Sequence, residues 1–233
     1  MTTLIGTREN VIEREGGLPV LIRNVNEAIE AWSLVHDSYV KQGYLKPNPF
    51  GIYCSPTSPR KGNVTGIVRD DNENVVGTAT GIPDSRYGFT METEFPEELK
   101  KLRHGGKKLF EIAHLAANGK TSPITVLQPA YSFARFSEAG NIILCAHPDM
   151  VPTYEGCWGA VPVGDQREIR GILTLGVLLS IDIIGSLSAP RRKFCGIKRL
   201  EKTWLKSPGS FFQDKYQWQD IDSSAIGEYL RSQ

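Results

Sequence analysis

A single carboxylate, Glu111, stands inside an otherwise apolar run, Leu109–Ala117. A run of this length and composition is typical of a buried β-strand. Burial disfavours the charged form of a carboxylate and raises its pKa toward the range in which it can accept a proton from a reacting group. Glu111 is therefore a candidate general base. A carboxylate that is paired for structural reasons is an equally weighted alternative.

Tyr154 follows the dipeptide His147-Pro148, where a second apolar run, Asn141–Ala146, ends. A phenol placed there can protonate a departing thiolate. The alternative is a core tyrosine whose hydroxyl reaches the surface. A carboxylate base at Glu111 and a phenol at Tyr154 are together suited to the transfer of an acyl group from a thioester to an amine.

The segment after Glu111 offers a place for the thioester donor. Splaying parallel strands leave backbone donors and acceptors free, and a helix starting at Ser122-Pro123 has free amides and a positive dipole end for phosphate. A plain strand-to-helix turn is the alternative, and a P-loop is excluded because no glycine stands in His114–Asn118. The predicted donor-binding residues are Ile112, Ala113, His114, Leu115, Ala116, Ala117, Asn118, Gly119, Lys120, Thr121 and Ser122.

Composition excludes several classes of function. The formal net charge is only +1, from 27 Lys and Arg against 26 Asp and Glu, so a nucleic-acid partner is not expected. Neither the 4 cysteines nor the 4 histidines have the spacing of a metal site, so we predict no metal and reduced thiols. The N-terminus lacks the apolar core of a secretory signal, which favours a cytoplasmic protein.

The remaining pattern predicts a mixed α/β fold. We expect a helix over Asn26–Gln42 with Asn26 as its cap, a long loop over 43–63, a hairpin from Val64 to Thr78, and a helix from Pro96 to Arg103. Beyond the strand at 109–117 we expect a helix after Ser122, which Pro129 delays to near Gln128. A parallel second strand then requires a right-handed crossover.

The last part of the predicted domain is strand-rich. We expect a strand at Asn141–Ala146, a short helix at Asp149–Trp158, and strands at Ala160–Val163 and Ile169–Asp182. The apolar run from Ile172 to Ala189 contains Asp182 and two glycines, so a buried strand is preferred to a membrane span.

Between residues 35 and 164 the chain resembles a known family, the long-chain N-acyl amino acid synthases, which are related to the acyl-homoserine-lactone autoinducer synthases. The matching segments, in order, are VHDSYVKQGYLKPNPFG, VVGTATGIPDS, FPEELKKLR, FEIAHLA and HPDMVPTYEGCWGAVPVG. The resemblance implies an acyl-CoA N-acyltransferase (GNAT) fold with a mixed central sheet. It implies an acyltransferase domain over 1–189, with 190–233 as a C-terminal extension that packs on it.

The resemblance also implies roles for individual residues. Glu111 matches the acid of an E-x-S-R strand pattern that orients or deprotonates the acceptor amine, and Tyr154 matches a tyrosine that acts as general acid. Tyr39, Tyr44, Phe50 and His147 would enclose the acceptor. The donor would be an acyl-phosphopantetheine thioester, with no permanently bound cofactor.

The chain departs from the family patterns at several positions. Ala113-His114 replaces the Ser-Arg of the strand pattern, and Thr153 begins a segment that differs from the usual F-Y-x-x-L-G-F. The pyrophosphate loop of acetyl-CoA enzymes is absent, which favours acyl carrier protein as donor over acyl-CoA. A basic cluster is either a solvated face or a dock for that acidic partner: Arg191, Arg192, Lys193, Lys198, Arg199, Lys202 and Lys206.

The expected activity is transfer of a long-chain fatty acyl group to the amine of an amino acid or a similar small molecule. Two other functions remain open at this point. One is an acetyl-CoA-dependent acetyltransferase, which donor preference would distinguish. The other is a catalytically silent module that binds an acyl group or a signal molecule, which the departures at Ala113, His114 and Thr153 make conceivable.

Overall fold

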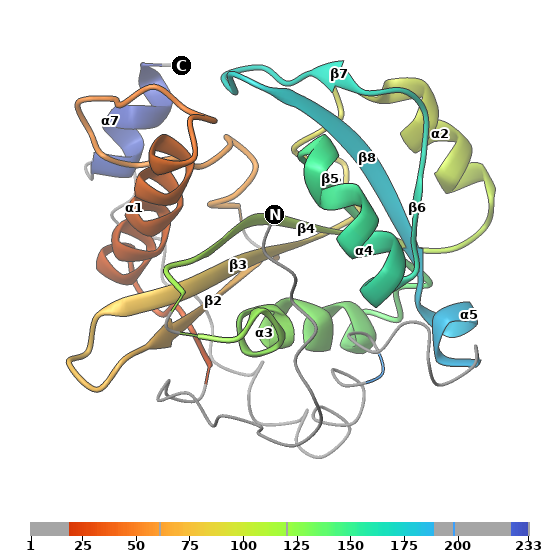
Figure 1. The fold of residues 1–233 in the computed structure, drawn as a ribbon, viewed down its shortest axis with the longest axis horizontal. Helices are drawn as coiled ribbons and strands as arrows, with labels where there is room; N and C mark the ends of the chain where they lie inside the picture. The colour runs from red at the N-terminus through yellow and green to blue at the C-terminus, as the bar shows by residue number, and fades with distance from the viewer. Residues whose placement is uncertain (1–18, 61, 120, 189–197, 199–224, 233) are drawn as a thin grey trace, which may run out of the picture.

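An 8-stranded mixed sheet forms the centre of the protein (Figure 1). It is seen in a computed structural model that describes residues 19–60, 62–119, 121–188, 198 and 225–232. The strand order is β1-β2-β3-β4-β5-β8-β6, with β7 paired to β8, and every neighbouring pair is antiparallel except β4 and β5. The predicted mixed α/β class is confirmed. The strands are β1 Val20–Leu21, β2 Val64–Arg69, β3 Val75–Pro83, β4 Leu109–Ala117, β5 Asn141–Ala146, β6 Ala160–Pro162, β7 Arg167–Glu168 and β8 Leu175–Asp182.

The first helix, α1, spans Val25–Lys41, and its cap differs from the prediction. Asn24, not Asn26, is the N-cap: its backbone is extended and its side chain accepts a hydrogen bond from the Glu27 amide at 3.0 Å. Asn26 already lies inside the first turn. Gly43 follows the helix at a φ of +75°, a left-handed backbone conformation that favours glycine.

Helix α3 spans Pro123–Phe136 without interruption, so the predicted delay at Pro129 is wrong. Ser122 caps it by accepting a hydrogen bond from the Ile124 amide. Pro129 forfeits one backbone bond, yet its ring packs directly on β2, where a Cβ added at Gly66 would lie 2.5 Å from its Cγ. Burial of the ring against the sheet offsets the lost bond, which local propensity does not reveal.

The part of the chain between α3 and the end of the sheet has fewer residues in strands than predicted. A 3-10 turn, Pro148–Met150, precedes α4, Val151–Trp158, and β6 ends at Pro162. Residues 169–174 form a loop between β7 and β8. The predicted strand therefore begins at Leu175 and not at Ile169. The strand then passes into α5, Ile183–Ser188. Among the described helices, none is both long and apolar enough to cross a bilayer.

Helices cover both faces of the sheet (Figure 1). On one face α3 and α4 bury apolar residues of β4, β5 and β8, including Phe110, Ile142 and Leu179. On the other face α1 and α7, Ala225–Arg231, pack over β2 and β4, and α2, Pro96–His104, packs over β4, β5 and β8. This arrangement buries the middle of β4 from both sides.

Two parts of the prediction fall on residues that the structure does not describe. The basic cluster lies outside the described residues except for Lys198. Most of the proposed extension over 190–233 is likewise outside them, although Ile226 and Tyr229 of α7 join the core beside Trp32. The domain division therefore stays a prediction.

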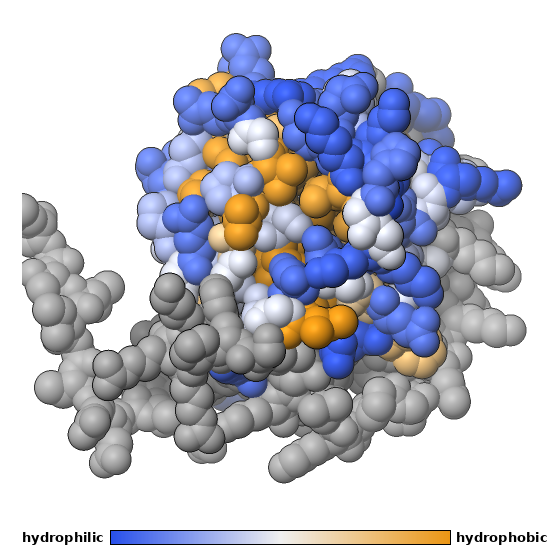
Figure 2. Space-filling view, turned by 90° about the vertical axis from the view of Figure 1, so that its right-hand side faces the viewer, coloured by the Kyte–Doolittle hydropathy of each residue, from blue (hydrophilic) through white to orange (hydrophobic). Residues whose placement is uncertain are grey.

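Apolar side chains remain exposed near the edge of the sheet. Figure 2 shows a group of apolar residues surrounded by hydrophilic ones on the side of the molecule that lies to the right in Figure 1. Val161 on the edge strand β6 is 62% exposed and Ile184 on α5 is 63% exposed. The described part of the chain does not cover these two side chains.

Candidate active site

The parallel strands β4 and β5 separate partway along their length. They pair at Leu109 with Asn141, Phe110 with Ile142 and Glu111 with Ile143, and no further. On its other edge β4 contains a bulge opposite Thr78 and Thr80, where His114 adopts a φ of +50°. The backbone of β4 after Glu111 is therefore not paired with β5, and its pairing with β3 is irregular.

A cavity occupies this split, and the non-atom space in and around it, open solvent included, is about 520 Å³. Most of its walls are apolar, and the side chains with polar groups in its lining include Tyr39, His114, Cys145 and Tyr154. The lining comes from α1, β4, β5, β8, α3 and α4, namely Tyr39, Ile112, Ala113, His114, Leu115, Leu127, Tyr131, Ile142, Leu144, Cys145, Tyr154, Trp158 and Ile181. A cavity of this kind can hold an acyl chain with its reactive end among the polar groups.

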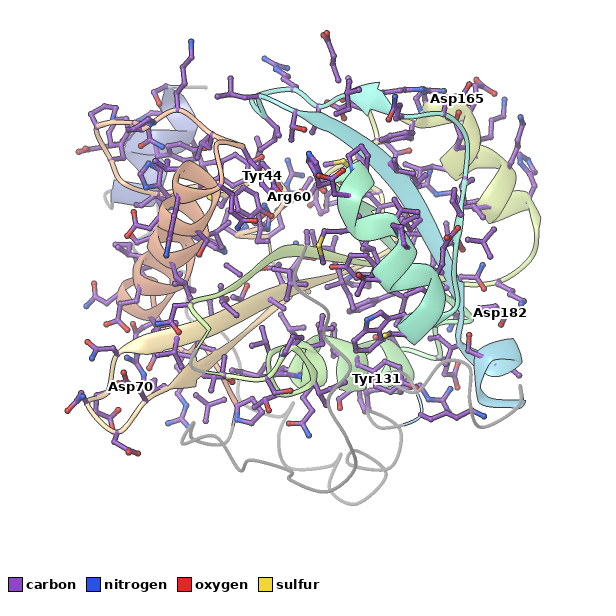
Figure 3. The ribbon with its side chains drawn as sticks, viewed as in Figure 1. Tyr44, Arg60, Asp70, Tyr131, Asp165 and Asp182 are labelled. Atoms are coloured by element: carbon purple, nitrogen blue, oxygen red, sulfur yellow. The ribbon has the colours of Figure 1, made fainter. Side chains whose placement is uncertain are left out.

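The cavity passes from one face of the sheet to the other. Tyr39 belongs to α1, whereas Tyr131 belongs to α3 on the opposite face. Figure 3 shows Tyr131 on α3, and Tyr44 near the end of α1. The gap between β4 and β5 is therefore the passage that connects the two sides.

Tyr154 lines the cavity, as required of a proton donor there. Burial raises its pKa above the ordinary value for a phenol. Burial also raises the pKa of Tyr39, and the nearby Tyr154 adds to that effect. Both hydroxyls are therefore protonated at neutral pH and available as hydrogen-bond donors.

Glu111 is 1% exposed and flanks the cavity without lining it. Its carboxylate accepts a hydrogen bond from the Thr90 amide at 2.7 Å and another from the Thr90 hydroxyl. Burial raises the pKa of Glu111 to about 7, because desolvation outweighs the Thr90 hydrogen bonds and nearby Glu92 and Glu94 act in the same direction as burial. A carboxyl with this pKa is poised to exchange protons near neutral pH.

Cys145 connects Glu111 to the cavity. Its thiol lines the cavity, and burial together with the charge of Glu111 raises its pKa. The electrostatic effect places the carboxylate close to the cavity wall. Glu111 and Tyr154, predicted from the sequence, thus approach the same cavity from the sides of β4 and α4.

The loop that carries Thr90 is fixed by Arg103 of α2. The Arg103 guanidinium donates to both oxygens of Asp84, at 2.9 and 3.0 Å, and to both oxygens of Glu92, at 2.6 and 2.8 Å. These bonds raise the pKa of Arg103 and lower that of Glu92. Bidentate pairs of this kind hold a loop in one geometry. Sequence reasoning missed Thr90, because nothing in the pattern links it to Glu111.

His114 is a buried histidine beside the cavity. Its Nε2 accepts a hydrogen bond from the Ser55 amide at 3.2 Å, so Nδ1 carries the proton and donates to the Ser58 hydroxyl at 3.2 Å. Burial lowers the pKa of His114 to about 4, so the ring is neutral at pH 7. These two hydrogen bonds hold the 55–58 loop against the bulge of β4. The sequence did not reveal either of them.

Aromatic rings form a wall beside the cavity. Tyr39 contacts Tyr44 and Tyr53 with ring centroids 6.0 and 5.5 Å apart, and Tyr44 stacks on His147 at 5.0 Å. Three predicted acceptor residues, Tyr39, Tyr44 and His147, are therefore brought together. Phe50 is not, because its ring contacts Tyr229 at 6.1 Å in the core beneath α1.

The later residues of the predicted donor segment lie away from the cavity. Ala116 joins the core against α1, and the Asn118 amide donates to the Val76 carbonyl at 3.1 Å. Thr121 is buried beside Gly77, and Ser122 serves as the helix cap. Ala117 and Gly119 are exposed. Lys120 lies outside the described residues, and a phosphate site at the start of α3 stays a prediction.

The described residues contain no group of His, Cys, Asp and Glu side chains that could hold a metal ion. Cys54, Cys145 and Cys157 are free thiols. The candidate site therefore consists of a carboxylate, phenols, a neutral imidazole and backbone groups around an apolar cavity.

Similarity to solved structures supports this description of the fold. The structure of FeeM, an N-acyl amino acid synthase from uncultured soil microbes, matches with a TM-score of 0.61 at 20% identity, over 71% of this chain and 90% of that one. TofI in a complex with an inhibitor and MTA matches with a TM-score of 0.57 at 20% identity, over 78% and 97%. BjaI, a CoA-dependent acyl-homoserine lactone synthase, matches with a TM-score of 0.54 at 13% identity, over 91% and 97%.

The sequence itself decides the family. A search of curated proteins finds no match. Residues 30–182, which include β2 to β8, match the family described as N-acyl amino acid synthase FeeM. The matched region contains Glu111, Tyr154 and every residue that lines the cavity. The chain therefore belongs to the FeeM N-acyl amino acid synthase family, and it is an acyltransferase.

Proposed function

We propose that this protein transfers a long-chain fatty acyl group from a phosphopantetheine thioester to the amine of an amino acid. The observation that carries the proposal is the apolar cavity in the β4–β5 split, lined by Tyr154 and flanked by Glu111. The related protein FeeM is named as an N-acyl amino acid synthase, which supports the same substrate classes.

The donor is an acyl carrier protein rather than acyl-CoA. The chain lacks the pyrophosphate loop of acetyl-CoA enzymes and carries a basic cluster between residues 191 and 206 that suits an acidic carrier. BjaI is named as a CoA-dependent synthase, so acyl-CoA is the donor to compare with the carrier protein. Charge reversal at Arg191 and Arg192 raises the KM for the carrier-borne donor and leaves the KM for acyl-CoA unchanged. An equal effect on both donors would show that the cluster does not dock the carrier.

Each catalytic group has one role in the proposed reaction. Glu111 receives a proton from the ammonium, and the free amine attacks the thioester carbonyl carbon. A C–N bond forms, the C–S bond breaks, and the departing thiolate takes a proton from Tyr154. The second proton of the amine is released as the amide forms, and it restores the tyrosine. The overall products are an N-acyl amino acid, a thiol and one proton.

The lining of the cavity favours a long acyl chain. Ile112, Leu127, Ile142, Leu144 and Trp158 bury apolar surface against whatever occupies the split. Each buried methylene contributes about 0.8 kcal/mol, which an acetyl group cannot supply. We therefore expect kcat/KM to rise with donor chain length until the cavity is filled.

A chain-length series tests this proposal. Carrier-borne acetyl, butyryl, octanoyl, dodecanoyl and palmitoyl donors are compared at one acceptor concentration, with product measured by mass spectrometry. The proposal predicts that kcat/KM increases at least about tenfold between butyryl and dodecanoyl. Highest activity with acetyl would identify an acetyltransferase and overturn the proposal.

A further inference from the structure

Thr90 holds both oxygens of the Glu111 carboxylate. Its backbone amide donates to Oε2 at 2.7 Å, and its hydroxyl donates to Oε1. Within the described part of the chain, these are the only hydrogen bonds that the carboxylate accepts. An ionised carboxylate has about four acceptor sites, and Thr90 occupies two of them. One acceptor site on each oxygen therefore remains for a substrate proton.

Thr90 stabilises the ionised form of Glu111 more than the neutral form. The amide can only donate, and a hydrogen bond to an ionised oxygen is about twice as strong as one to a neutral oxygen. Both influences that lower the pKa of Glu111 come from Thr90, and they oppose the larger effect of burial. Without these bonds the carboxyl would keep its proton to a higher pH.

No cation among the described residues bonds to the Glu111 carboxylate in place of Thr90. Arg103, the nearby arginine of α2, bonds to Glu92 and not to Glu111. The other titratable groups around Glu111 either raise its pKa or are uncharged at neutral pH. They are Glu92 and Glu94 of the loop between β3 and α2, the Cys145 thiol of β5 and the His114 ring of β4.

Phe89 anchors Thr90 beside the sheet. Its side chain is 2% exposed and belongs to the same core cluster as Ile82 and Ile143. These two residues are paired with Glu111 on the neighbouring strands β3 and β5. The residue next to Thr90 is therefore buried among the strand neighbours of Glu111.

The opposite side of this loop is held by Arg103. The Phe89 amide donates to Glu92 Oε2 at 3.1 Å, and the Arg103 guanidinium donates to the same oxygen at 2.8 Å. The guanidinium carbon also lies 5.1 Å from the centroid of the Phe89 ring. A hydrogen-bond donor held from both sides needs no rearrangement when charge develops on its acceptor.

We propose that Thr90 is a positioning residue for acyl transfer, because it holds the ionised Glu111 carboxylate by both oxygens and leaves two acceptor sites for the incoming ammonium. This inference rests on the proposed function, in which Glu111 is the base. Thr90 acts through Glu111 and takes no proton itself.

The kinetic test compares Thr90→Val with Thr90→Ser in the full chain. Valine keeps the shape and the backbone amide but removes the hydroxyl, so the rising limb of kcat/KM for the amine moves up by about one pH unit. The valine variant is then about tenfold slower at about pH 6 and within about twofold of the wild type at about pH 9. Thr90→Ser keeps the hydroxyl and restores the wild-type limb. Thr93→Val, at an exposed position of the same loop, is the matched control and leaves the profile unchanged.

A second readout needs no activity. The carbon-13 shift of the Glu111 carboxyl is followed against pH in the full-length protein, and its signal is identified by its loss in Glu111→Gln. We expect the midpoint to lie about one pH unit higher in Thr90→Val than in the wild type or in Thr90→Ser.

The two readouts separate this inference from the proposed function. If the wild type acylates an amino acid and the Thr90→Val limb stays in place, or its rate falls equally at every pH, the inference is overturned and the proposed function stands. If the wild type acylates no amino acid, the proposed function fails and the carboxyl titration decides the role of Thr90. A raised midpoint in Thr90→Val then supports the hold of Thr90 on ionised Glu111, and an unmoved midpoint overturns it.

Discussion

Glu111 combines a buried carboxylate with a pKa of about 7, which predicts how the reaction depends on pH. Only the ionised form accepts a proton, so kcat/KM for the amine rises as pH increases through about 7. Glu111→Gln removes the base and lowers kcat by about 10²–10⁴-fold, and it also removes this limb of the profile. The measurement is kcat/KM from about pH 5 to about pH 9 for both proteins. An unaltered rate in the variant would leave Glu111 without a catalytic role.

The same pKa shift links Glu111 to stability. The carboxyl binds its proton more tightly in the folded state, where its pKa is about 7, than at its ordinary value of 4.5. Its contribution to the free energy of unfolding is therefore complete below pH 4.5 and is lost as pH rises through 7, by roughly 3 kcal/mol in total. Urea titrations across this window should show a shallower decline for Glu111→Gln. Parallel curves for variant and wild type would contradict the shift.

His114 acts on stability through the loop that it fixes. His114→Leu removes the imidazole partner of the Ser55 amide and of the Ser58 hydroxyl, which keep the hydrogen bonds between Ser55 and Ser58. Each lost hydrogen bond contributes about 0.5–1.5 kcal/mol, so we expect a loss of about 1–3 kcal/mol in the free energy of unfolding. The control is His104→Leu on an exposed position of α2, which should change stability by less than about 0.5 kcal/mol. Equal effects of the two substitutions would show that the loop contacts are not stabilising.

Sequence patterns identified some site residues and missed others for a physical reason. Glu111 stood out because a charge in an apolar strand is unusual, and Tyr154 because it follows the end of the next strand. Thr90 and Ser58 contact the site across 21 and 56 residues of chain, and the loops between them have no periodicity that would predict such pairings. The raised pKa of Glu111 was predicted, whereas the loop that covers it was not.

Close packing between α3 and the sheet makes a prediction about whole elements. Gly66→Ala on β2 drives a methyl group into the Pro129 ring of α3, which lies 2.5 Å from the added Cβ. Overpacking of this kind costs about 1–3 kcal/mol. The same substitution at Gly156, in the exposed middle of α4 with nothing within 4 Å, should stabilise by about 0.5–1 kcal/mol. Thermal denaturation of both variants checks the opposite signs, and a neutral Gly66→Ala would contradict the packing of α3 on β2.

Elements with strong local patterns were predicted with accurate bounds, and those decided by packing were not. The β4 and β5 bounds agree with the apolar runs at 109–117 and 141–146. The helix start predicted near Gln128 was wrong because the burial of the Pro129 ring against Gly66 is a tertiary effect. Ile169 and Ile172 suggested a strand but are apolar because they pack in a loop against β4 and β5. Asn24 and Asn26 are both suitable caps, and only the backbone conformation distinguishes them.

The arrangement of the whole molecule follows from one parallel pair inside an otherwise antiparallel sheet. The crossover through α3 makes β5 parallel to β4, and the separation of these strands leaves a mainly apolar cavity that is lined from both faces of the sheet. Order along the chain predicted this topology, because successive strand, helix and strand elements permit few connections. The loop that precedes β8 packs against β4 and β5, and no local pattern predicted its position.

The most direct test of the central proposal is product analysis by mass spectrometry. The purified protein is incubated with palmitoyl carrier protein, palmitoyl-CoA and acetyl-CoA in separate reactions, each with a mixture of amino acids. A palmitoylated amino acid formed with the carrier-borne donor, and reduced at least about a hundredfold in Glu111→Gln, is the predicted result. Product from acetyl-CoA alone, or from none of the three donors, would contradict a long-chain N-acyl amino acid synthase.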